Sequence, residues 1–552
     1  MATMSFDATG AAQQAVEHHV TTLVADKVAS RVFAKDPTLW GPDAESESAI
    51  RLGWVEAPAV SAPLVAEILA LREELRADGV THLVLAGMGG SSLAPEVITA
   101  TAGVELTVLD STDPDQVRAA LADRLAETAI VVSSKSGSTL ETDSQRRIFE
   151  QEFTKAGVDA KSRIIIVTDP GSPLDKESRK AGYRRVFNAD PNVGGRYSAL
   201  TAFGLVPSGL AGVDIQALLD EAEEAAEVLR DDAPDNIGLA LASALAGTDP
   251  LRNKIVIVDE GSGIVGFADW AEQLIAESTG KLGTGLLPVV AASGSPEVTS
   301  GADDVLLVRL VAADLDVDLA ETLLQKLPEN QVSIAGGLGT QMMVWEFAVA
   351  VAGRLLGINP FDQPDVEAAK KAARGLLDKQ PETQPANFVD GAIEVRGPEW
   401  LGDARTTGEA LERLFGQLGP QGYLSVQAYF DRISYASLVE IRDPLAALTN
   451  RPVTFGWGPR FLHSTGQFHK GGPAIGVFLQ ITAAAEQDLG IPDRPFSFGE
   501  LIRAQAAGDA QVLTEHGRPL LRLHLRDRDA GVEQLRSMVT ALEHPSILPQ
   551  GN

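Results

Sequence analysis

Short apolar runs alternate with longer amphipathic stretches along the first 310 residues of the chain. The runs are rich in Val, Ile and Leu. They lie at 81–87, 105–110, 129–134, 163–168, 254–260, 286–290 and 303–310. Strands that alternate with helical intervals are typical of βαβ units around a buried parallel sheet. We therefore expect two similar α/β domains in tandem.

The pattern becomes less regular after about residue 380, where a polar stretch contains Pro and Gln. Beyond it, 450–458 and 519–527 have the character of strands, and the apolar run 475–489 predicts a helix. Between the tandem domains, 217–235 carries acidic residues at helical spacing, which indicates a solvated helix face near a linker. We expect the C-terminal region to be an α/β extension.

The amino-acid composition and net charge exclude several classes of protein function. Among 552 residues, 46 Lys and Arg stand against 76 Asp and Glu, a net charge of −30 that excludes a general nucleic-acid binder. The absence of Cys removes disulfides, thiolate metal sites and Cys nucleophiles. The N-terminus lacks the features of a signal peptide, and no uninterrupted apolar run approaches the ~18 residues of a membrane span. A cytoplasmic protein without a membrane partner is expected.

Two loops that follow strands are candidates for binding an anion. Gly87–Ser92 (GMGGSS) follows 81–87, and Ser133–Thr142 (SSKSGSTLET) follows 129–134 and opens a helix. Backbone amides, hydroxyl groups and Lys135 could bind a phosphate at the carboxyl edge of a parallel sheet. Each loop taken alone is equally explained by tight packing or helix capping.

The second domain contains a glycine motif that resembles a dinucleotide-binding loop. GSGIVG (261–266) matches G-x-G-x-x-G after the strand at 254–260, but the next strand ends without the carboxylate that would hold a ribose. We expect no nicotinamide cofactor, and no cofactor of any kind. The helix that follows places Gln273 and Glu277 on one face. That glutamate is either a general base or an ordinary surface residue.

Two later segments carry further candidates. Residues 359–373 begin a helix with Pro364 in its first turn and Lys370 about two turns in, where nothing local separates Lys370 from an exposed lysine. Residues 460–473 hold His463 and His469 in a Gly-rich loop. Their spacing matches no familiar zinc site, so we expect no metal and interpret them as acid/base or ligand-binding groups.

In combination, five motifs resemble the phosphoglucose isomerase family, which is built from two sugar-isomerase (SIS-type) domains. In family order they are GMGGSSLAP, SKSGSTLET, VGGRYSA (193–199), QLIAESTGK and FDQPDVEAAK, with Asp365 where the family has Gly. The C-terminal region resembles the isomerase half of fused transaldolase/phosphoglucose isomerase proteins, without a transaldolase half. The resemblance implies two tandem doubly wound parallel-sheet SIS-type domains plus a C-terminal α/β extension. The expected domain limits are 1–55 (a helical segment), 56–240, 241–385 and 386–552.

The resemblance also implies roles for residues. Glu277 would move a proton between C2 and C1 of the sugar through a cis-enediol, Arg196 would stabilise the enediolate, and Lys370 would assist ring opening. Gln273 would orient the substrate. The phosphate would be held by the glycine loop and the hydroxyl loop, through Gly89, Gly90, Ser91, Ser134, Lys135, Ser136 and Thr139.

One family feature is missing. The ring-opening histidine of the family lies between the catalytic Glu and Lys, and this chain has no His between Glu277 and Lys370. His463 and His469 are the substitutes, delivered by the C-terminal region or by a neighbouring subunit, with His469 preferred. His82, inside a strand, is expected to be a satisfied core residue.

The function implied is reversible isomerisation of D-glucose 6-phosphate and D-fructose 6-phosphate by a homodimer without a cofactor. A non-catalytic sugar-phosphate-binding regulator and an isomerase of a related hexose phosphate, such as mannose 6-phosphate, remain alternatives. A regulator needs neither Glu277 nor Lys370, so their presence favours the enzyme. Because the net charge of −30 repels a dianionic substrate, we expect Lys135, Arg196, Lys281 and Lys370 to form a local positive pocket.

Overall fold

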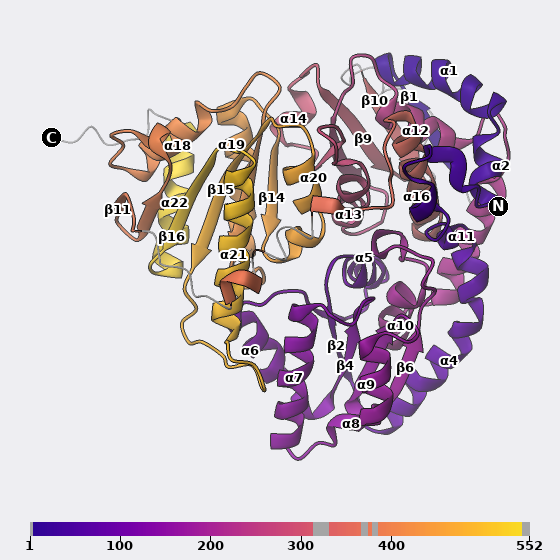
Figure 1. Cartoon of the computed structure of the whole chain (residues 1–552), viewed down its shortest axis with the longest axis horizontal. Helices are drawn as coiled ribbons and strands as arrows, with labels where there is room; N and C mark the ends of the chain where they lie inside the picture. The colour runs from indigo at the N-terminus through magenta and orange to yellow at the C-terminus, as the bar shows by residue number, and fades with distance from the viewer. Residues whose placement is uncertain (1–3, 313–329, 366–371, 373, 378–384, 544–552) are drawn as a thin grey trace.

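The computed structural model describes residues 4–312, 330–365, 372, 374–377 and 385–543. Within these ranges the chain forms three β-sheets covered by helices (Figure 1). The helices of residues 10–25 and 528–543 lie toward opposite sides of this view.

The first sheet has five parallel strands in the order β3-β2-β4-β5-β6. β2, β4 and β5 are buried along their whole length, which explains their continuous apolar sequences. The strands are β2 (His82–Gly87), β3 (Thr107–Leu109), β4 (Thr128–Ser133), β5 (Ile164–Thr168) and β6 (Arg185–Asn188). The helices of this region are α4 (Ala57–Ala77), α5 (Leu93–Thr101), α6 (Pro114–Ala122), α7 (Leu140–Lys155), α8 (Ala160–Arg163), α9 (Pro173–Ala181), α10 (Ala202–Ala211) and α11 (Ile215–Leu229).

His82 on β2 is a satisfied core residue, as expected. Its side chain is buried, with Nδ1 2.9 Å from Oγ1 of Thr128 and Nε2 2.8 Å from Oγ1 of Thr107. Both ring nitrogens therefore have partners inside the sheet.

The second sheet has the order β1-β10-β9-β7-β8, with β1 antiparallel and the other neighbours parallel. Its strands are β1 (Ser5–Ala8), β7 (Lys254–Glu260), β8 (Leu287–Ala291), β9 (Val305–Val311) and β10 (Gln331–Ala335). Its helices are α12 (Ile237–Ala246), α13 (Phe267–Thr279), α14 (Pro296–Thr299) and α16 (Leu338–Leu355). The N-terminal segment, expected to be helical, thus begins with an edge strand of this sheet. It continues as α1 (Gly10–Ala25), α2 (Val28–Phe33), η1 (Pro37–Trp40), α3 (Glu45–Ser48) and η2 (Gly53–Glu56).

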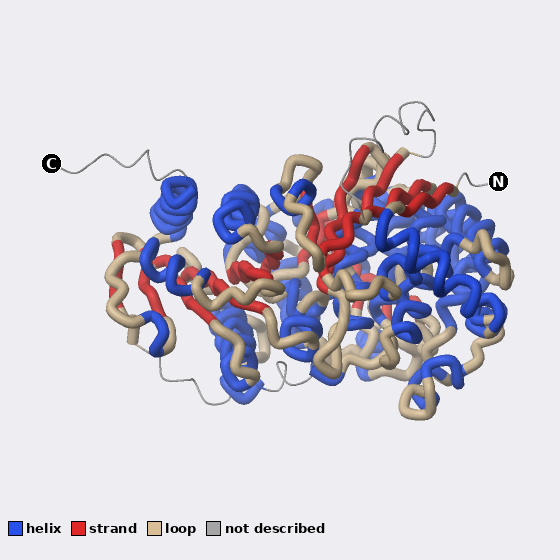
Figure 2. Tube along the Cα trace, turned by 90° about the horizontal axis from the view of Figure 1, so that it is seen from above, coloured by secondary structure: helices blue, strands red, loops and turns tan. Residues whose placement is uncertain are grey.

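The C-terminal region forms a third sheet in the order β11-β12-β16-β15-β13-β14, whose four strands from β16 to β14 are parallel. The strands are β11 (Phe388–Asp390), β12 (Ile393–Arg396), β13 (Tyr423–Tyr429), β14 (Val453–Trp457), β15 (Gly476–Ala483) and β16 (Leu520–Leu525). The helices are η6 (Glu399–Leu401), α18 (Thr407–Phe415), η7 (Ala436–Ile441), α19 (Arg442–Thr449), η8 (Arg460–His463), α20 (Gly466–Gly471), α21 (Phe498–Glu515) and α22 (Arg528–Glu543). Figure 2 shows helices on both sides of this sheet.

The prediction of a helix over 475–489 is wrong. Residues Gly476–Ala483 form β15, a central strand with parallel neighbours on both sides. Because such a strand is buried on both faces, its sequence GVFLQITA is a nearly continuous apolar run, which periodicity cannot distinguish from a buried helix.

The third sheet is tied to both other sheets through α21 and α20. Phe498 and Leu501 of α21 join the apolar cluster on one face of the first sheet, with Ile130 and Ile166. Leu513 at the other end of α21 and Phe468 of α20 join the cluster against the second sheet. These contacts bring the loop before α20 to the carboxyl edge of the first sheet.

One helical stretch, Gly53–Ala77, is long and apolar enough to cross a membrane by length and composition. Its residues Ile68, Leu71 and Leu75 are buried in the protein core, so we interpret it as a core helix. Two tandem parallel-sheet regions and a C-terminal α/β extension are confirmed, whereas the exact domain limits stay predictions.

Candidate active site

The carboxyl ends of β2 and β4 lead into the two loops that the sequence singled out. β2 continues into a short 3₁₀ turn, η3 (Gly89–Ser91), before α5, and β4 continues into the loop 134–139 before α7. The two strands are hydrogen-bonded neighbours with Gly87 opposite Ser133. The two loops therefore start side by side at one edge of the sheet.

The loop 134–139 is held together by its own hydroxyl groups. Oγ of Ser134 donates to Oγ1 of Thr139 at 3.1 Å and accepts from the amide of Gly137 at 3.2 Å. The hydroxyls of Ser136 and Ser138 are 2.9 Å apart. Thr139 is the N-cap of the 16-residue helix α7, yet its side chain makes no capping hydrogen bond among the described residues. The first-turn amides of α7 can therefore donate to an anion.

The side chain of Lys135, within this loop, is bonded to residues outside the loop. Its Nζ is 2.7 Å from Oδ2 of Asp169 and 3.3 Å from the carbonyl oxygen of Pro191. Burial raises the pKa of Asp169, and Lys135 opposes that rise. The charge of Lys135 is thus partly balanced within the protein.

The glycines of η3 allow a second motif and the C-terminal region to approach. A Cβ on Gly90 would clash with the carbonyl of Gly195, in the turn η5 (Gly195–Tyr197) that carries Arg196. Gly89 has a φ of +55°, and a Cβ there would lie 2.8 Å from Nε2 of Gln273 and 2.9 Å from the carbonyl oxygen of His463. Only glycine fits both positions, and the close approach brings together segments about 100, 180 and 370 residues apart. Ser91 is half-buried at the end of the same turn.

Gln273, Glu277 and Arg196 form one buried polar cluster. Nε2 of Gln273 donates to Oε2 of Glu277 at 2.9 Å, one helical turn away on α13. A guanidinium nitrogen of Arg196 lies 3.5 Å from Oε1 of Glu277, and Nε of Arg196 donates to Oγ of Ser278 at 2.8 Å. Glu277 is 8% exposed and Arg196 is 3% exposed, so the pair is largely shielded from water.

The loop 359–363 fixes the far side of Arg196. The guanidinium donates to the carbonyl oxygens of Pro360 and Asp362 at 2.6 and 3.0 Å, and to Oε1 of Gln363 at 2.6 Å. Lys281, at the end of the motif on α13, binds the same loop through the carbonyl oxygen of Asn359 at 2.8 Å and the carboxylate of Asp362 at 2.7 Å. Burial, together with Arg196, lowers the pKa of Lys281 to about 8.

This structural role of Lys281 was missed at the sequence level, where it appeared only as a contributor of charge. A signal was present in the sequence, because ESTGK and FDQ both belong to the motifs that carry the family resemblance, and a Lys and an Asp of opposite charge can pair. Since Lys135 and Lys281 are both bonded to carboxylates, the expected positive pocket is weaker than their formal charges suggest.

The two candidate histidines have opposite surroundings. His463, in η8, points to the first sheet, where its Nε2 is 3.1 Å from Oε1 of Glu141 on α7. Glu141 also accepts from Nε2 of Gln505 on α21 at 2.7 Å. When Nε2 donates to this carboxylate, Nδ1 is the acceptor of the ring.

His469 is placed in the core of the C-terminal region. It is 2% exposed, with Nδ1 2.9 Å from the hydroxyl of Tyr423 and Nε2 3.4 Å from Oγ of Ser425. Burial, with the nearby cations Lys470 and Arg518, holds the pKa of His469 well below its usual value. The structure thus places His469 among Tyr423, Ser425 and aromatic rings of the C-terminal region, and His463 beside Glu141 of the first sheet, so the preference for His469 stays a prediction that its burial does not favour.

The fifth motif, FDQPDVEAAK, contains Asp365 and the predicted Lys370. Asp365, which stands where the family has Gly, is hydrogen-bonded by Gln467 of α20 through its backbone amide at 3.0 Å and its carboxylate at 2.6 Å. The same Gln467 donates to the carbonyl oxygen of Gly280 at 2.9 Å. Helix α20 thus links two of the motifs. The predicted Lys370 lies outside the described residues.

The sequence is similar to known proteins over about half of its length. The family profile described as phosphoglucose isomerase matches residues 74–281. A protein of Natronomonas pharaonis named a probable glucose-6-phosphate isomerase is 32% identical over 333 residues, which cover 53% of this chain and 78% of that one. The glucose-6-phosphate isomerase of Gloeothece citriformis is 30% identical over 55% of this chain and 67% of its own.

The match spans about two thirds of the length of other relatives. The glucose-6-phosphate isomerase of a Synechococcus strain is 29% identical, and the alignment covers 66% of it and 54% of this chain.

Solved structures of similar fold include a hypothetical protein of Thermus thermophilus, with a TM-score of 0.54 and 24% identity, which covers 68% of this chain and all of that one. A glucose-6-phosphate isomerase of Chlamydia trachomatis has a TM-score of 0.51 and 21% identity over 65% of this chain and 79% of that one. These two likenesses support the tandem sheet arrangement. By sequence, the chain belongs to the phosphoglucose isomerase family.

Proposed function

We propose that this protein interconverts D-glucose 6-phosphate and D-fructose 6-phosphate through a cis-enediol. The observation that carries the proposal is the buried cluster of Glu277, Gln273 and Arg196 beside the turn η3, which starts next to the loop 134–139. Proton transfer between C2 and C1 needs a base held close to the carbon acid, and a cation that stabilises the charge on the enediolate oxygen. Glu277 and Arg196 supply these two groups.

The phosphate of the substrate would bind at the loop 134–139 and the adjoining turn. The hydroxyl of Ser134 bonds to that of Thr139, and the hydroxyl of Ser136 to that of Ser138, so these groups can turn toward a phosphate and exchange one hydroxyl partner for another. The N-terminus of α7 adds its backbone amides and the positive end of its dipole. Ser91, Gly89 and Gly90 would line the side of the site nearest Arg196.

His463 would open and close the sugar ring, with Glu141 holding its orientation. Its backbone lies beside Gly89, as does the side chain of Gln273, which puts an acid/base group close to the cluster. The C-terminal region would then supply within one chain the histidine that the second domain lacks. Lys370 stays a predicted helper in ring opening. A homodimer in the cytoplasm stays a prediction of the family resemblance.

The alternatives use the same loops. A sugar-phosphate-binding regulator would need the loop 134–139 but no base, and the arrangement of Glu277 with Arg196 favours the enzyme over it. An isomerase of mannose 6-phosphate would use the same base with a different pocket shape at C2.

The test is a coupled assay in which purified protein converts fructose 6-phosphate to glucose 6-phosphate with EDTA present. We expect turnover in the wild type and a loss of about 10³-fold in kcat for Glu277→Gln, because a positioned base contributes roughly 10²–10⁴-fold. The exposed Glu227→Gln on α11 is the matched control and should retain full activity. Substrate affinity of Glu277→Gln, measured by calorimetry, should change by less than about threefold, since the amide keeps the hydrogen bonds.

Two results would contradict the proposal. Wild-type protein that binds fructose 6-phosphate without turning it over would favour the regulator. A Glu277→Gln variant with nearly normal kcat would remove Glu277 as the base.

A further inference from the structure

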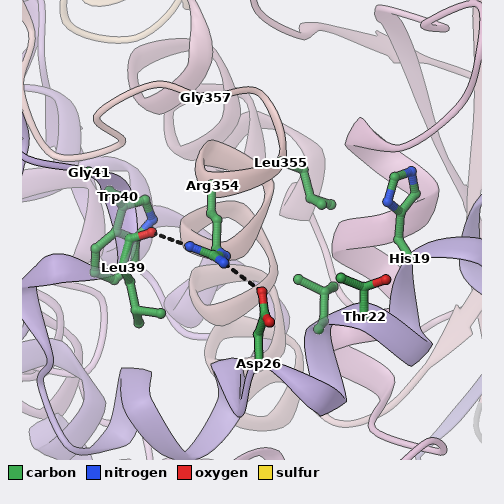
Figure 3. Close-up of a pocket in the computed structure, with 10 residues that line it drawn as sticks. His19, Thr22, Asp26, Leu39, Trp40, Gly41, Arg354, Leu355 and Gly357 are labelled. Carbon is green, nitrogen blue, oxygen red and sulfur yellow. Dashed lines mark hydrogen bonds and ion pairs between the residues drawn. The ribbon is translucent and has the colours of Figure 1, made fainter.

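A cavity of about 440 Å³ lies between the N-terminal segment and the end of α16, open to solvent at the exposed residues Thr22 and Asp26, and none of its lining residues belongs to the candidate active site (Figure 3). Its apolar wall consists of Leu23 from α1, Leu39 and Trp40 from η1, and Leu355 from α16. The polar side chains that face it are His19, Thr22 and Asp26 from α1 and Arg354 from α16. Such a volume is in the usual range of small-molecule sites.

The polar groups of this cavity are only partly used by the protein. Arg354 donates to the carbonyl oxygen of Leu39 at 2.7 Å and to Oδ2 of Asp26 at 2.8 Å, and its Nε makes no hydrogen bond with a described residue. His19 donates from Nε2 to the carbonyl oxygen of Gly247 at 3.1 Å, which leaves Nδ1 as an acceptor on the neutral ring. The second carboxylate oxygen of Asp26 and the hydroxyl of Thr22 likewise accept no hydrogen bond from another residue in the part of the chain described here.

The charges and shape select a class of ligand. Arg354 offers a donor to a carboxylate, and Asp26 with His19 offers acceptors to an ammonium group a few ångströms away. The wall of Leu23, Leu39 and Trp40 suits an apolar side chain. A molecule with all three features and no net charge also escapes the repulsion that a protein of charge −30 exerts on anions. We propose that this cavity binds a zwitterionic α-amino acid with an apolar side chain.

The cavity is connected to Arg196 of the candidate site by packed side chains. Trp40 contacts Phe361 edge to face at 4.9 Å between ring centroids, and Phe361 contacts Tyr197 at 5.6 Å. The hydroxyl of Tyr197 is 3.2 Å from Oγ of Ser278, which also accepts from Arg196. These contacts run alongside the loop 359–363, which follows α16 and binds Arg196. A ligand that orders Trp40 therefore stabilises the loop that holds the cation.

The first experiment measures binding alone, by calorimetry of the full chain with L-leucine. A ligand of this size is expected to bind with a Kd of about 1 mM. N-acetyl-L-leucine lacks the ammonium group, and L-leucinamide lacks the carboxylate. If the cavity binds both charged groups of the amino acid, each of these compounds should bind at least about tenfold more weakly than L-leucine.

Variants locate the site on the protein. Arg354→Met and Asp26→Asn should each weaken L-leucine at least about tenfold. The exposed Glu17→Gln, on the same helix α1 but outside the cavity, should bind normally. Because Arg354→Met also loses its bond to Leu39, Asp26→Asn keeps the test valid if Arg354→Met does not fold. The proposal is overturned if L-leucine gives no saturable binding, if N-acetyl-L-leucine binds as well as L-leucine, or if the folded variants bind normally.

A second experiment tests the connection, and this part rests on the proposed function. The Kd of L-leucine is measured with and without saturating fructose 6-phosphate, whose own binding is checked separately in the same calorimeter. Coupled sites must affect each other reciprocally, so we expect L-leucine to bind about threefold more tightly or better when the sugar is bound. Unchanged affinity with the sugar demonstrably bound would overturn the connection, and failure of the sugar to bind would count against the proposed function only.

Discussion

The two sides of the candidate site are held together differently. Arg196, Gln273 and Glu277 are buried and bound by charged or amide hydrogen bonds to α13 and the loop 359–363. The loop 134–139 is more exposed, and its hydroxyls bond mainly to each other. Catalytic groups at the reacting carbon need to be held rigidly before the substrate binds. The loop that binds the phosphate can instead be ordered by the ligand itself.

From this difference we expect the buried cluster and the loop 134–139 to control different kinetic parameters. Groups that are already in place act on kcat, because they meet charge that develops in the transition state. Groups that bind the unreactive phosphate contribute equally to substrate and transition state, and so act on KM. His463 belongs to the first side by its fixed bond to Glu141, although it comes from a different domain.

The largest effect that tests this division is expected from His463→Ala. Loss of an acid/base group should lower kcat for closed-ring fructose 6-phosphate by about 10²-fold, with KM nearly unchanged. The comparison variant is His469→Asn, six residues away. It should retain kcat in its folded fraction but lose about 1–3 kcal/mol of stability, because the smaller side chain leaves a cavity where the imidazole ring packs on Tyr423, Phe461 and Phe478. Coupled assays and thermal melts of both variants measure these effects.

The division between the two histidines would be wrong in one clear case. If His469→Asn lost activity without losing stability while His463→Ala kept its kcat, the ring-opening group would be His469 after all.

A smaller effect is expected on the phosphate side. Ser134→Ala and Thr139→Val should each raise KM about tenfold and leave kcat within about twofold, because a hydrogen bond to a charged group contributes roughly 1.5–3 kcal/mol. Thr154→Val, at the opposite and exposed end of α7, is the control and should change neither parameter. Steady-state kinetics separates the outcomes. A fall in kcat with KM unchanged would place these hydroxyls with the catalytic groups and remove the contrast between the two sides.

Much of the site could be predicted from the sequence because its motifs lie at strand ends. The strands β2, β4, β5 and β7 are continuous apolar runs, so a parallel sheet and the position of the loops at its carboxyl edge follow directly. The i, i+4 spacing of Gln273 and Glu277 likewise predicts the hydrogen bond that the structure contains.

The rest depended on tertiary packing that no local pattern records. Nothing near His463 or His469 tells which ring faces Glu141, since that is decided by how α20 and η8 lie against α13. β15 could not be told from a helix, because burial on both faces erases the alternation of a strand. The exchange of Gly for Asp at 365 is understood only with Gln467 in view, a residue about 100 positions later.

The smallest effect concerns Glu272, which is half-buried on α13 just before Gln273 and connects the catalytic side to the loop of His463. Oγ of Ser464 donates to its Oε1 at 3.1 Å. Burial, with the nearby Asp269, raises the pKa of Glu272 to about 8, although Ser464 and Arg460 oppose the rise. In the folded protein this carboxyl therefore keeps a proton between about pH 4.5 and 8, where the unfolded chain has already lost it.

It follows that Glu272 makes the folded protein less stable as the pH rises through that window, because the native state then binds more protons than the unfolded state. Glu272→Gln removes this proton uptake. From pH 5.5 to pH 8 the variant should lose about 1 kcal/mol less stability than the wild type, a difference of about 2 °C in Tm, reduced by the partial exposure of the side chain. Thermal melts at both pH values measure it, with Glu227→Gln as the control. An identical pH dependence in the variant and the wild type would mean that Glu272 is ionised at neutral pH, and that the contact between α13 and the loop of His463 carries a charge.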